Sequence, residues 1–402
     1  MPKINTEIEN FARIKVIGVG GSGKNALNHM ISSNISGVEF ICMNTDTQDL
    51  HNSKANKKIH IGRNLTQGKG TGMNPEIGRA AAEETKAEIQ ECIKGADMVF
   101  IACGMGGGTG TGAAPIVAQT SKDQGCLTIA IVTKTFRFEG QNRIKIAEQG
   151  ILELEKYVDA MIVIPNEQLL AIASKDTSFK DAFAMSDEIL RQAVEGISEL
   201  ITTQGLINID YADIKAIMQN AGSAFMGIGH ASGEDRATDA AYMAINSPLL
   251  DVSISGAKGV LFAISGGDDL TMHEVHTIAD IITDSVDPEA KIIFGPIHDE
   301  KLKKGEIKVT VIATGFNPQK KSENRDSAPA FRTLKPSPKV ESLEQQPITK
   351  SVPISSSLPP ISQIPEREPD QVIKRPEPNQ VLEEISDDDD WSGVPAFLRR
   401  KK

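Results

Sequence analysis

Two glycine-rich segments carry the residues whose types and spacing point most directly to chemistry. The first, GVGGSGKN, covers residues 18–25, and the second, GMGGGTGTG, covers residues 104–112. Glycines let backbone N–H groups approach phosphate oxygens closely, and the positive end of a following helix favours the negative charge. Both segments therefore predict binding of phosphate by the backbone.

Taken alone, the first segment is compatible with three kinds of site. Gly18, Gly20 and Gly23 match the dinucleotide fingerprint G-x-G-x-x-G. Gly18 with Gly23 and Lys24 nearly matches the P-loop, but Asn25 stands where that motif has the Ser or Thr that ligates magnesium. The segment could also be one of several loops that share a single nucleotide.

The second segment favours the last of these alternatives, because two strand-to-helix glycine loops on one sheet form a double cradle for a di- or triphosphate. A third turn, GKGTGMN at residues 68–74, could close over the terminal phosphate. A nicotinamide-dependent oxidoreductase stays as an alternative. Asp46 lies 46 − 23 = 23 positions after Gly23, near the spacing at which such enzymes carry a ribose-binding acid.

Five short apolar runs supply the strands that would position these loops. They are nearly continuous and rich in β-branched residues, as is typical of strands covered on both faces. Helical patterns separate them, and one that begins at Asn74-Pro75-Glu76 is expected to run to Gly95. This alternation predicts an α/β fold with a parallel, doubly wound sheet. The runs cover residues 13–19, 38–44, 97–103, 127–133 and 160–165.

A long central helix is expected over residues 178–203, because apolar residues recur along one of its faces. It would join a nucleotide-binding domain, residues 13–177, to a second α+β domain, residues 204–316. That second domain carries strand candidates at 224–230, 260–265, 291–294 and 307–314, and helix candidates at 235–245 and 271–285.

The two ends of the chain are expected to lie outside these domains. Residues 1–12 read as a flexible N-terminus. Residues 317–386 are rich in Pro, Ser, Lys and Glu and predict a disordered C-terminal linker. Residues 387–402 contain the only tryptophan, Trp391, followed by Val394, Phe397 and Leu398. Apolar anchors at the end of a tether suggest a peptide that docks into a partner's groove.

Composition excludes some functions. Lys and Arg minus Asp and Glu give 43 − 54 = −11, whereas nucleic-acid binders usually carry a basic surface. No run reaches the roughly 18 apolar residues of a membrane span, and the N-terminus resembles no secretion signal. We therefore expect a soluble, cytoplasmic protein without a direct membrane span. The four cysteines are far apart, which suggests reduced, buried thiols: Cys42, Cys92, Cys103 and Cys126.

Asp187 interrupts the apolar face of the long helix. A carboxylate in that position is costly unless it is paired. Guanine presents N1–H and N2–H₂ as adjacent donors that a carboxylate accepts together, whereas adenine reverses that pattern. Phe183 lies one turn earlier on the same face and could stack on the base. The two residues could therefore recognise guanine, the alternative for Asp187 being a structural cap or ion pair.

The residues that would hydrolyse a triphosphate are not found in the glycine loops. Asp210 and Asp213 follow the long helix, at the opposite end from Asp187. At 1.5 Å of rise per residue, the helix spans about 24 Å between residues 187 and 203. One molecule therefore cannot bring these acids to its own nucleotide, but a second molecule stacked head to tail can, and repetition makes a filament.

The motifs together resemble the FtsZ family of cell-division GTPases, within the tubulin superfamily. The resemblance rests on GGGTGTG at residues 106–112, NTD at 44–46, FEG at 138–140, NIDYAD at 208–213 and VPAFLR at 394–399, and it covers residues 13–316 and the chain's end. It implies that the chain binds GTP or GDP, with Mg²⁺ held through phosphates and water.

The resemblance also assigns roles by position. The acids and amide inserted into the next subunit's site would be Asn208, Asp210 and Asp213. The positions that would contact the nucleotide, with the third turn near the γ-phosphate and the FEG segment near ribose and phosphate, are Gly21, Ser22, Gly23, Lys24, Asn25, Asn44, Thr71, Gly72, Gly107, Gly108, Thr109, Gly110, Glu139, Arg143, Phe183 and Asp187.

The implied partners are other copies of this chain, in head-to-tail filaments at the mid-cell division site, and membrane-tethering division adaptors that bind residues 391–402. No nucleic acid is implied. Departures from the family's loops, including Ser22 and Lys24, leave open a second reading. In that reading the chain is a GTP-binding structural polymer with little or no turnover.

Overall fold

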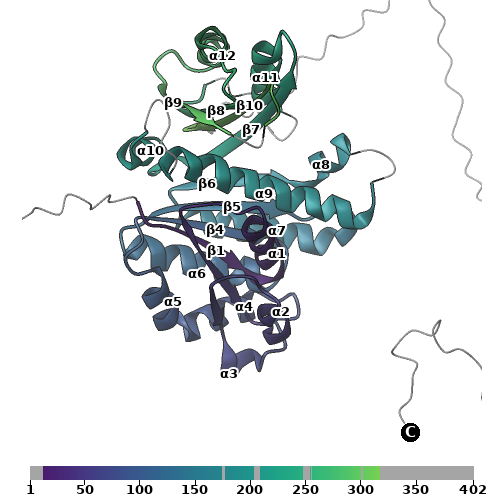
Figure 1. Ribbon diagram of the computed structural model, residues 1–402. Helices are drawn as coiled ribbons and strands as arrows, with labels where there is room; N and C mark the ends of the chain where they lie inside the picture. Colours follow the sequence, from purple (N-terminus) through teal and green to yellow (C-terminus); the bar gives the residue numbers. More distant parts are fainter. Residues whose placement is uncertain are drawn as a thin grey trace, which may run out of the picture. The chain divides into compact units, whose positions relative to one another are not determined.

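The computed structural model describes residues 12–173, 177–202, 209–247, 254, 256–299 and 302–316. The flexible N-terminus expected over residues 1–12 (Ala12 apart), the linker at 317–386 and the docking peptide at 387–402 lie outside the described residues. The described part is built on one ten-stranded sheet in the order β3-β2-β1-β4-β5-β6-β7-β10-β8-β9 (Figure 1).

Six strands of this sheet run parallel and match the predicted doubly wound arrangement. Along β1, Ile14 and Val16 face one core while Ile17 and Val19 face another, so both faces are buried. The strands are β1 (Ile14–Val19), β2 (Val38–Asn44), β3 (Lys57–His60), β4 (Met98–Gly104), β5 (Leu127–Lys134) and β6 (Ala160–Pro165).

Helices cover both faces of the parallel strands. One core packs α1 and the long helix α9 onto the sheet, and the other packs α4, α5, α6 and α7, so that α9 and α6 lie on opposite sides (Figure 1). The helices of this half are α1 (Gly20–Ser32), α2 (Thr47–His51), α3 (Arg63–Thr66), α4 (Pro75–Glu84), α5 (Lys86–Ile93), α6 (Thr109–Asp123), η1 (Arg137–Glu139), α7 (Gln141–Glu155), α8 (Asn166–Ile172) and α9 (Phe179–Thr202).

The remaining strands continue the same sheet. β7 pairs in parallel with β6 and antiparallel with β10, which in turn pairs antiparallel with β8. α11 and α12 pack on them in a third core. The elements are α10 (Tyr211–Met218), β7 (Gly222–Ser232), α11 (Arg236–Ile245), β8 (Gly259–Gly266), α12 (Met272–Asp284), β9 (Lys291–His298) and β10 (Glu306–Thr314). The predicted α/β fold, with a long helix and a following α+β region, is confirmed.

One local prediction needs correction, and one strand was missed. The single helix expected from Asn74 to Gly95 is wrong, because the chain breaks at Thr85 into α4 and α5. The Thr85 hydroxyl accepts a hydrogen bond from the Gly62 N–H, so the break lets the loop before α3 attach. Strand β3 was not predicted, because its sequence KKIH contributes only Ile59 to the core.

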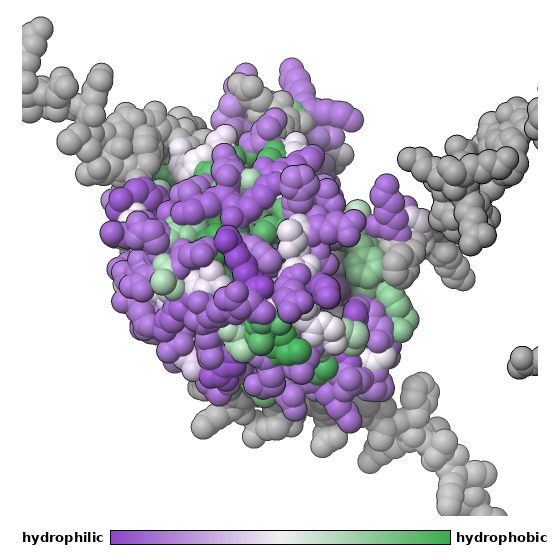
Figure 2. All heavy atoms as spheres, turned by 90° about the horizontal axis from the view of Figure 1, so that it is seen from below, coloured by the Kyte–Doolittle hydropathy of each residue, from purple (hydrophilic) through white to green (hydrophobic). Residues whose placement is uncertain are grey.

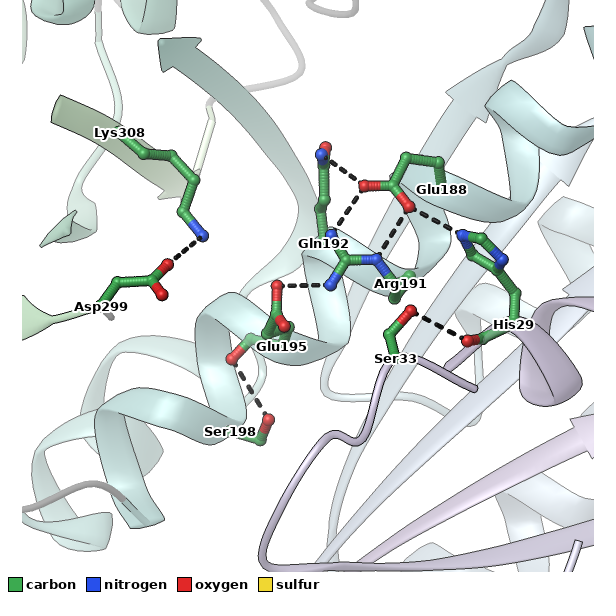
Figure 3. A network of polar contacts seen from close by, with 9 residues as sticks. All are labelled: His29, Ser33, Glu188, Arg191, Gln192, Glu195, Ser198, Asp299 and Lys308. Carbon is green, nitrogen blue, oxygen red and sulfur yellow. Dashed lines mark hydrogen bonds and ion pairs between the residues drawn. The ribbon is translucent and has the colours of Figure 1, made fainter. Parts of the chain in front are cut away.

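A network of polar side chains on α9 reaches α1 through the contact between Glu188 and His29 (Figure 3). His29 on α1 lies 2.8 Å from a Glu188 oxygen, and Arg191 binds Glu188 and the buried Glu195, each at 2.6 Å. Burial raises the pKa of Glu188, but hydrogen bonds from Arg191 and His29 outweigh it and hold that pKa below its usual range. The residue next to Glu188 is Asp187, so this network places that carboxylate relative to the first glycine loop.

The surface seen from below is mostly hydrophilic, with apolar residues in small separate groups (Figure 2). Among the described residues, no helix combines the length and the apolar character that crossing a membrane requires. The four cysteines are buried and unbridged, as expected.

Candidate functional site

A cavity of about 450 Å³ opens at the carboxyl ends of the parallel strands. Val19 ends β1, Gly104 ends β4 and Lys134 ends β5, and all three line it. β1 and β4 are neighbours in the sheet although β2 and β3 come between them in the chain. This is the point where the strand order reverses, which is where open α/β sheets bind ligands.

Two helix N-termini form one wall of the cavity. α1 begins at Gly20 and α6 at Thr109, and the loops before them touch. A Cβ atom added to Gly20, whose φ is +74°, would lie 3.0 Å from the Gly110 nitrogen, so this approach requires glycine. A Cβ at Gly107 would meet nothing within 4 Å. The wall therefore offers exposed backbone N–H groups and two positive helix ends to an anion.

The opposite wall comes from the start of α9. Asp187 lines the cavity, and it forms no hydrogen bond or ion pair with any described residue. Burial raises the pKa of Asp187 to about 6, against the opposing charges of His29 and Lys24. A desolvated carboxylate without a donor gains most from a ligand that supplies donors.

Aromatic residues border this carboxylate. The ring of Phe183 meets the buried Phe136 edge to face, with centroids 5.1 Å apart, and Phe136 stacks on Phe138 at 4.9 Å. Phe183 lines the cavity and is 37% exposed. One turn of α9 thus presents a flat apolar surface beside an acceptor.

Glu139 on η1 and Arg143 on α7 line the cavity as an ion pair. Glu139 also accepts a hydrogen bond of 3.1 Å from the Phe136 N–H, which fixes its side chain. The third turn reaches the cavity through Thr71, whose hydroxyl lies 3.3 Å from that of Thr109. The three glycine-bearing segments therefore meet around one cavity.

Most of the nucleotide-contacting positions assigned from the sequence line this cavity: Gly21, Ser22, Asn25, Thr71, Gly107, Gly108, Thr109, Gly110, Glu139, Arg143, Phe183 and Asp187. Gly23, Lys24, Asn44 and Gly72 are not among the lining residues. A Cβ atom at Gly23 would lie 2.4 Å from the Ala102 carbonyl oxygen on β4, so this glycine serves packing. Lys24 and Asn44 both bind Asp49 on α2.

Five lining residues outside the three glycine-bearing segments were not assigned from the sequence: Thr133, Lys134, Thr135, Asn166 and Ser186. Ser186 donates a 3.0 Å hydrogen bond to Asn166, which ties the start of α8 to α9. Thr133 and Asn166 lie where β5 and β6 end, so the rule that parallel strands carry ligands at their carboxyl ends would have found them.

The acids assigned to hydrolysis lie elsewhere. Asp210 precedes α10 and Asp213 lies in its first turn, where its carboxylate accepts a 3.3 Å hydrogen bond from the Asp210 N–H. Neither lines the cavity, and α10 follows the far end of α9 (Figure 1). From Asp187 to Thr202 that helix spans about 23 Å at 1.5 Å per residue. Asn208 lies outside the described residues.

In the described part of the chain, no three His, Cys, Asp or Glu side chains are grouped as metal ligands. Asp46, the acid that a dinucleotide fingerprint would need, accepts a 3.0 Å hydrogen bond from the Asp49 N–H and so caps α2. It does not line the cavity.

Comparison with known proteins agrees with this geometry. Residues 13–174 match the model of the Tubulin/FtsZ family GTPase domain, and residues 222–317 match that of the FtsZ family C-terminal domain. The chain is similar to FtsZ from M. jannaschii, solved as an empty dimer, with 47% sequence identity, a TM-score of 0.73 and coverage of 76% of this chain and 88% of that one.

Two further structures extend the comparison. A mutant of the same M. jannaschii FtsZ is 46% identical, with a TM-score of 0.73 and coverage of 76% of this chain and 92% of that chain. A GTPγS-bound protofilament of CetZ2 from Haloferax volcanii is 20% identical, with a TM-score of 0.65 and coverage of 76% and 94%. At that identity the likeness concerns the fold alone.

Proposed function

This chain belongs to the FtsZ family of the tubulin superfamily, and we propose that it is a self-assembling GTPase that forms head-to-tail filaments at the cell-division site. The observation that carries the proposal is Asp187, a desolvated carboxylate without a described partner, across a cavity from two helix N-termini. A guanine nucleotide carries hydrogen-bond donors on its base at one end and phosphates at the other. The donors match the Asp187 wall, and the phosphates match the wall of helix N-termini.

GTP or GDP would be held along the whole cavity. The backbone N–H groups of the two glycine loops would bind the phosphates, and Glu139 with Arg143 would contact ribose and phosphate. Asp187 would accept the guanine N1–H and N2–H₂ donors while the Phe183 ring stacks on the base. The 450 Å³ volume falls within the range of small-ligand sites.

A Mg²⁺ ion fits this site only through the nucleotide. The acids that line the cavity are Glu139, which is paired with Arg143, and Asp187 beside the expected base. Neither is placed to ligate an ion at the glycine loops, so phosphate oxygens and water would hold it. When bound, the ion would neutralise charge that develops on the phosphates during hydrolysis.

The acids for hydrolysis would come from the next subunit. Asp210 and Asp213 lie at the other end of α9 and cannot reach their own molecule's cavity. In a head-to-tail stack, that end of one molecule would face the cavity of its neighbour, where Asp210, Asp213 and Asn208 would position the attacking water. The dimer reported for M. jannaschii FtsZ supports self-association of this chain.

GTP turnover per molecule is therefore expected to depend on protein concentration. Below a threshold, isolated molecules lack the second set of acids and should release almost no phosphate; above it, the specific activity should rise to a plateau as filaments sediment. Phosphate release with Mg²⁺, measured across a hundredfold concentration series, tests this. Full specific activity in a dilute, non-sedimenting sample would contradict the shared site, and filaments without sustained release would favour a structural polymer.

We propose that residues 391–402 connect the filaments, which lie in the cytoplasm at mid-cell, to the membrane through a division adaptor. Deleting residues 391–402 should leave filament formation and GTP turnover within about twofold of the full chain, because none of the residues that line the cavity is removed. The same deletion should abolish binding to a membrane-tethering division adaptor, measured by co-sedimentation. Retained adaptor binding would contradict this assignment, and an internal deletion of equal length in residues 317–386 is the matched control.

A further inference from the structure

A chain of polar contacts runs behind the cavity and links all three glycine-bearing segments. It begins at Lys24 on α1, whose ammonium lies 2.5 Å from one Asp49 oxygen. Asn44, at the end of β2, donates a 2.7 Å hydrogen bond to the other Asp49 oxygen. The Asn44 side-chain oxygen accepts from the Thr45 N–H at 2.8 Å.

The chain continues through threonine hydroxyls. Thr45 Oγ1 lies 2.6 Å from Thr109 Oγ1 in the second loop, and Thr109 Oγ1 lies 3.3 Å from Thr71 Oγ1 in the third. One hydroxyl, that of Thr109, therefore joins the second loop to the third, and Thr45 joins both to the Lys24 end. The linked residues include members of α1, α2, β2, α6 and the third turn, so the contacts tie these segments together.

The first four members of this chain, Lys24, Asn44, Asp49 and Thr45, are not among the residues that line the cavity. Lys24, Asn44 and Thr45 are 9%, 3% and 0% exposed. Asp49 Oδ2 would lie 3.4 Å from a Cβ atom on Gly21, so it lies against the back of the first loop. The Asp49 side chain is 29% exposed. A largely buried polar network in which every member is paired rigidifies its surroundings.

We propose that Lys24 and Asp49 are positioning residues, which act through Asn44, Thr45 and Thr109 to hold Thr71 and its turn at the terminal phosphate of the nucleotide. This inference rests on the proposed function, in which the third turn lies near the γ-phosphate. It gives Lys24 a role different from that of a P-loop lysine: its ammonium is neutralised by Asp49 and orders the loops, and does not bind phosphate.

Direct electrostatics offers a rival explanation with opposite consequences. If Lys24 attracted phosphate and Asp49 repelled it, removing Lys24 would weaken nucleotide binding and removing Asp49 would strengthen it. If both residues act by positioning, removing either one weakens nucleotide binding. The affinity is then lost at the terminal phosphate, which the third turn contacts. We therefore expect a large loss of affinity for a triphosphate and a much smaller loss for a diphosphate.

The test compares two dissociation constants in each variant. Competition with a fluorescent guanine nucleotide, in Mg²⁺ and below the assembly concentration, gives the values for GDP and for a non-hydrolysable GTP analogue. Lys24→Met and Asp49→Ala should each lower the ratio Kd(GDP)/Kd(GTP analogue) about fivefold, the scale of one lost hydrogen-bonded link. The double variant should lose no more than either single, since the two act as one unit.

Thr45→Val probes the same chain without any change of charge. It removes the contact with Thr109 in nearly the same volume, so it should also lower the ratio about fivefold. Thr120→Val is the matched control, because Thr120 is equally buried and bonds only the Ile116 carbonyl on its own helix. Lys156→Met is the control for loss of a lysine ion pair, here with Glu153. Thermal unfolding confirms that each variant is folded.

Three results would overturn the inference. Opposite changes in affinity for Lys24→Met and Asp49→Ala would favour direct electrostatics. An equal loss of GDP and GTP-analogue binding, with the ratio unchanged in Thr45→Val, would leave only a structural role. A wild-type chain that binds neither nucleotide would contradict the proposed function itself, and this inference with it.

Discussion

Replacing Asp213 with alanine is expected to leave GTP binding intact and to reduce GTP turnover by about a hundredfold or more. Asp213 lies at the start of α10 and does not line the cavity of its own molecule, so the binding site is unchanged. The lost carboxylate would have oriented water in the neighbour's site, and removal of one such positioned group typically costs that much in rate. Phosphate release above the assembly threshold and nucleotide binding below it measure the two effects.

Asp213 also has a structural role, which a second variant separates from the chemical one. Its carboxylate accepts a hydrogen bond from the Asp210 N–H, and losing such a cap costs about 1 kcal/mol of stability. Asp213→Asn keeps an acceptor for that N–H but removes the charge. We expect it to restore the stability lost in Asp213→Ala while turnover stays low. Recovery of turnover together with stability would indicate that Asp213 only caps the helix.

Mixing two inactive variants tests the sharing of the site directly. Asp213→Ala binds GTP but lacks the acid, and Asp187→Ala keeps the acid but lacks the base contact. In a mixed filament, Asp213→Ala can hold GTP against a neighbour that supplies Asp213. Random mixing should restore activity at up to about a quarter of the interfaces. A mixture no more active than the sum of its components would contradict the shared site.

How far the sequence predicts this fold depends on how local the signal is. The parallel strands and α9 were predictable, because continuous apolar runs and a long amphipathic face carry their own signal. β3 was not, because two of its four residues are exposed lysines. The break at Thr85 depends on the Gly62 N–H, which lies 23 residues earlier and leaves no local mark in the sequence.

The residues of the site likewise differ in how far the sequence alone identifies them. Gly107, Thr109 and Asp187 could be assigned because glycine loops and a carboxylate on an apolar face are unusual in themselves. The direction of the Lys24 side chain could not, since it is set by Asp49, which lies 25 residues away on another helix. The sequence therefore locates the loops of this cavity better than it distinguishes residues that line it from residues that support it.

Replacing Asp187 with asparagine is expected to change which base the cavity accepts. The new amide side chain would offer one acceptor and one N–H₂ donor in place of two acceptors, so the guanine N2–H₂ group would face a donor. Xanthine carries an oxygen where guanine carries N2–H₂, and it restores the match. We expect the affinity for GTP to fall at least a hundredfold and that for xanthosine triphosphate to rise, because an unpaired buried polar group is strongly rejected.

Competition binding with GTP, xanthosine triphosphate and ATP measures this exchange. Asp181→Asn provides the matched control, since Asp181 lies on the same helix, is exposed and does not line the cavity. Its preference for GTP should equal that of the wild type. An equal loss of affinity for GTP and xanthosine triphosphate in Asp187→Asn would mean that Asp187 supports the cavity without contacting the base.

The same carboxylate predicts how GTP affinity depends on pH. Burial raises the pKa of Asp187 to about 6 in the unliganded protein, and only the ionised form accepts both guanine donors. Affinity should therefore be constant above about pH 7 and fall by up to tenfold per unit below about pH 6, with proton release on binding in that range. Asp187→Asn should show no such dependence.

The stability of the unliganded fold changes with pH in the opposite sense. A raised pKa means that the native state binds the proton more tightly than the unfolded chain does. The contribution of Asp187 to the free energy of unfolding therefore declines as the pH rises from about 4 to 6. A loss of affinity at low pH that merely reflected unfolding would persist in Asp187→Asn, and that result would exclude Asp187 as the group responsible.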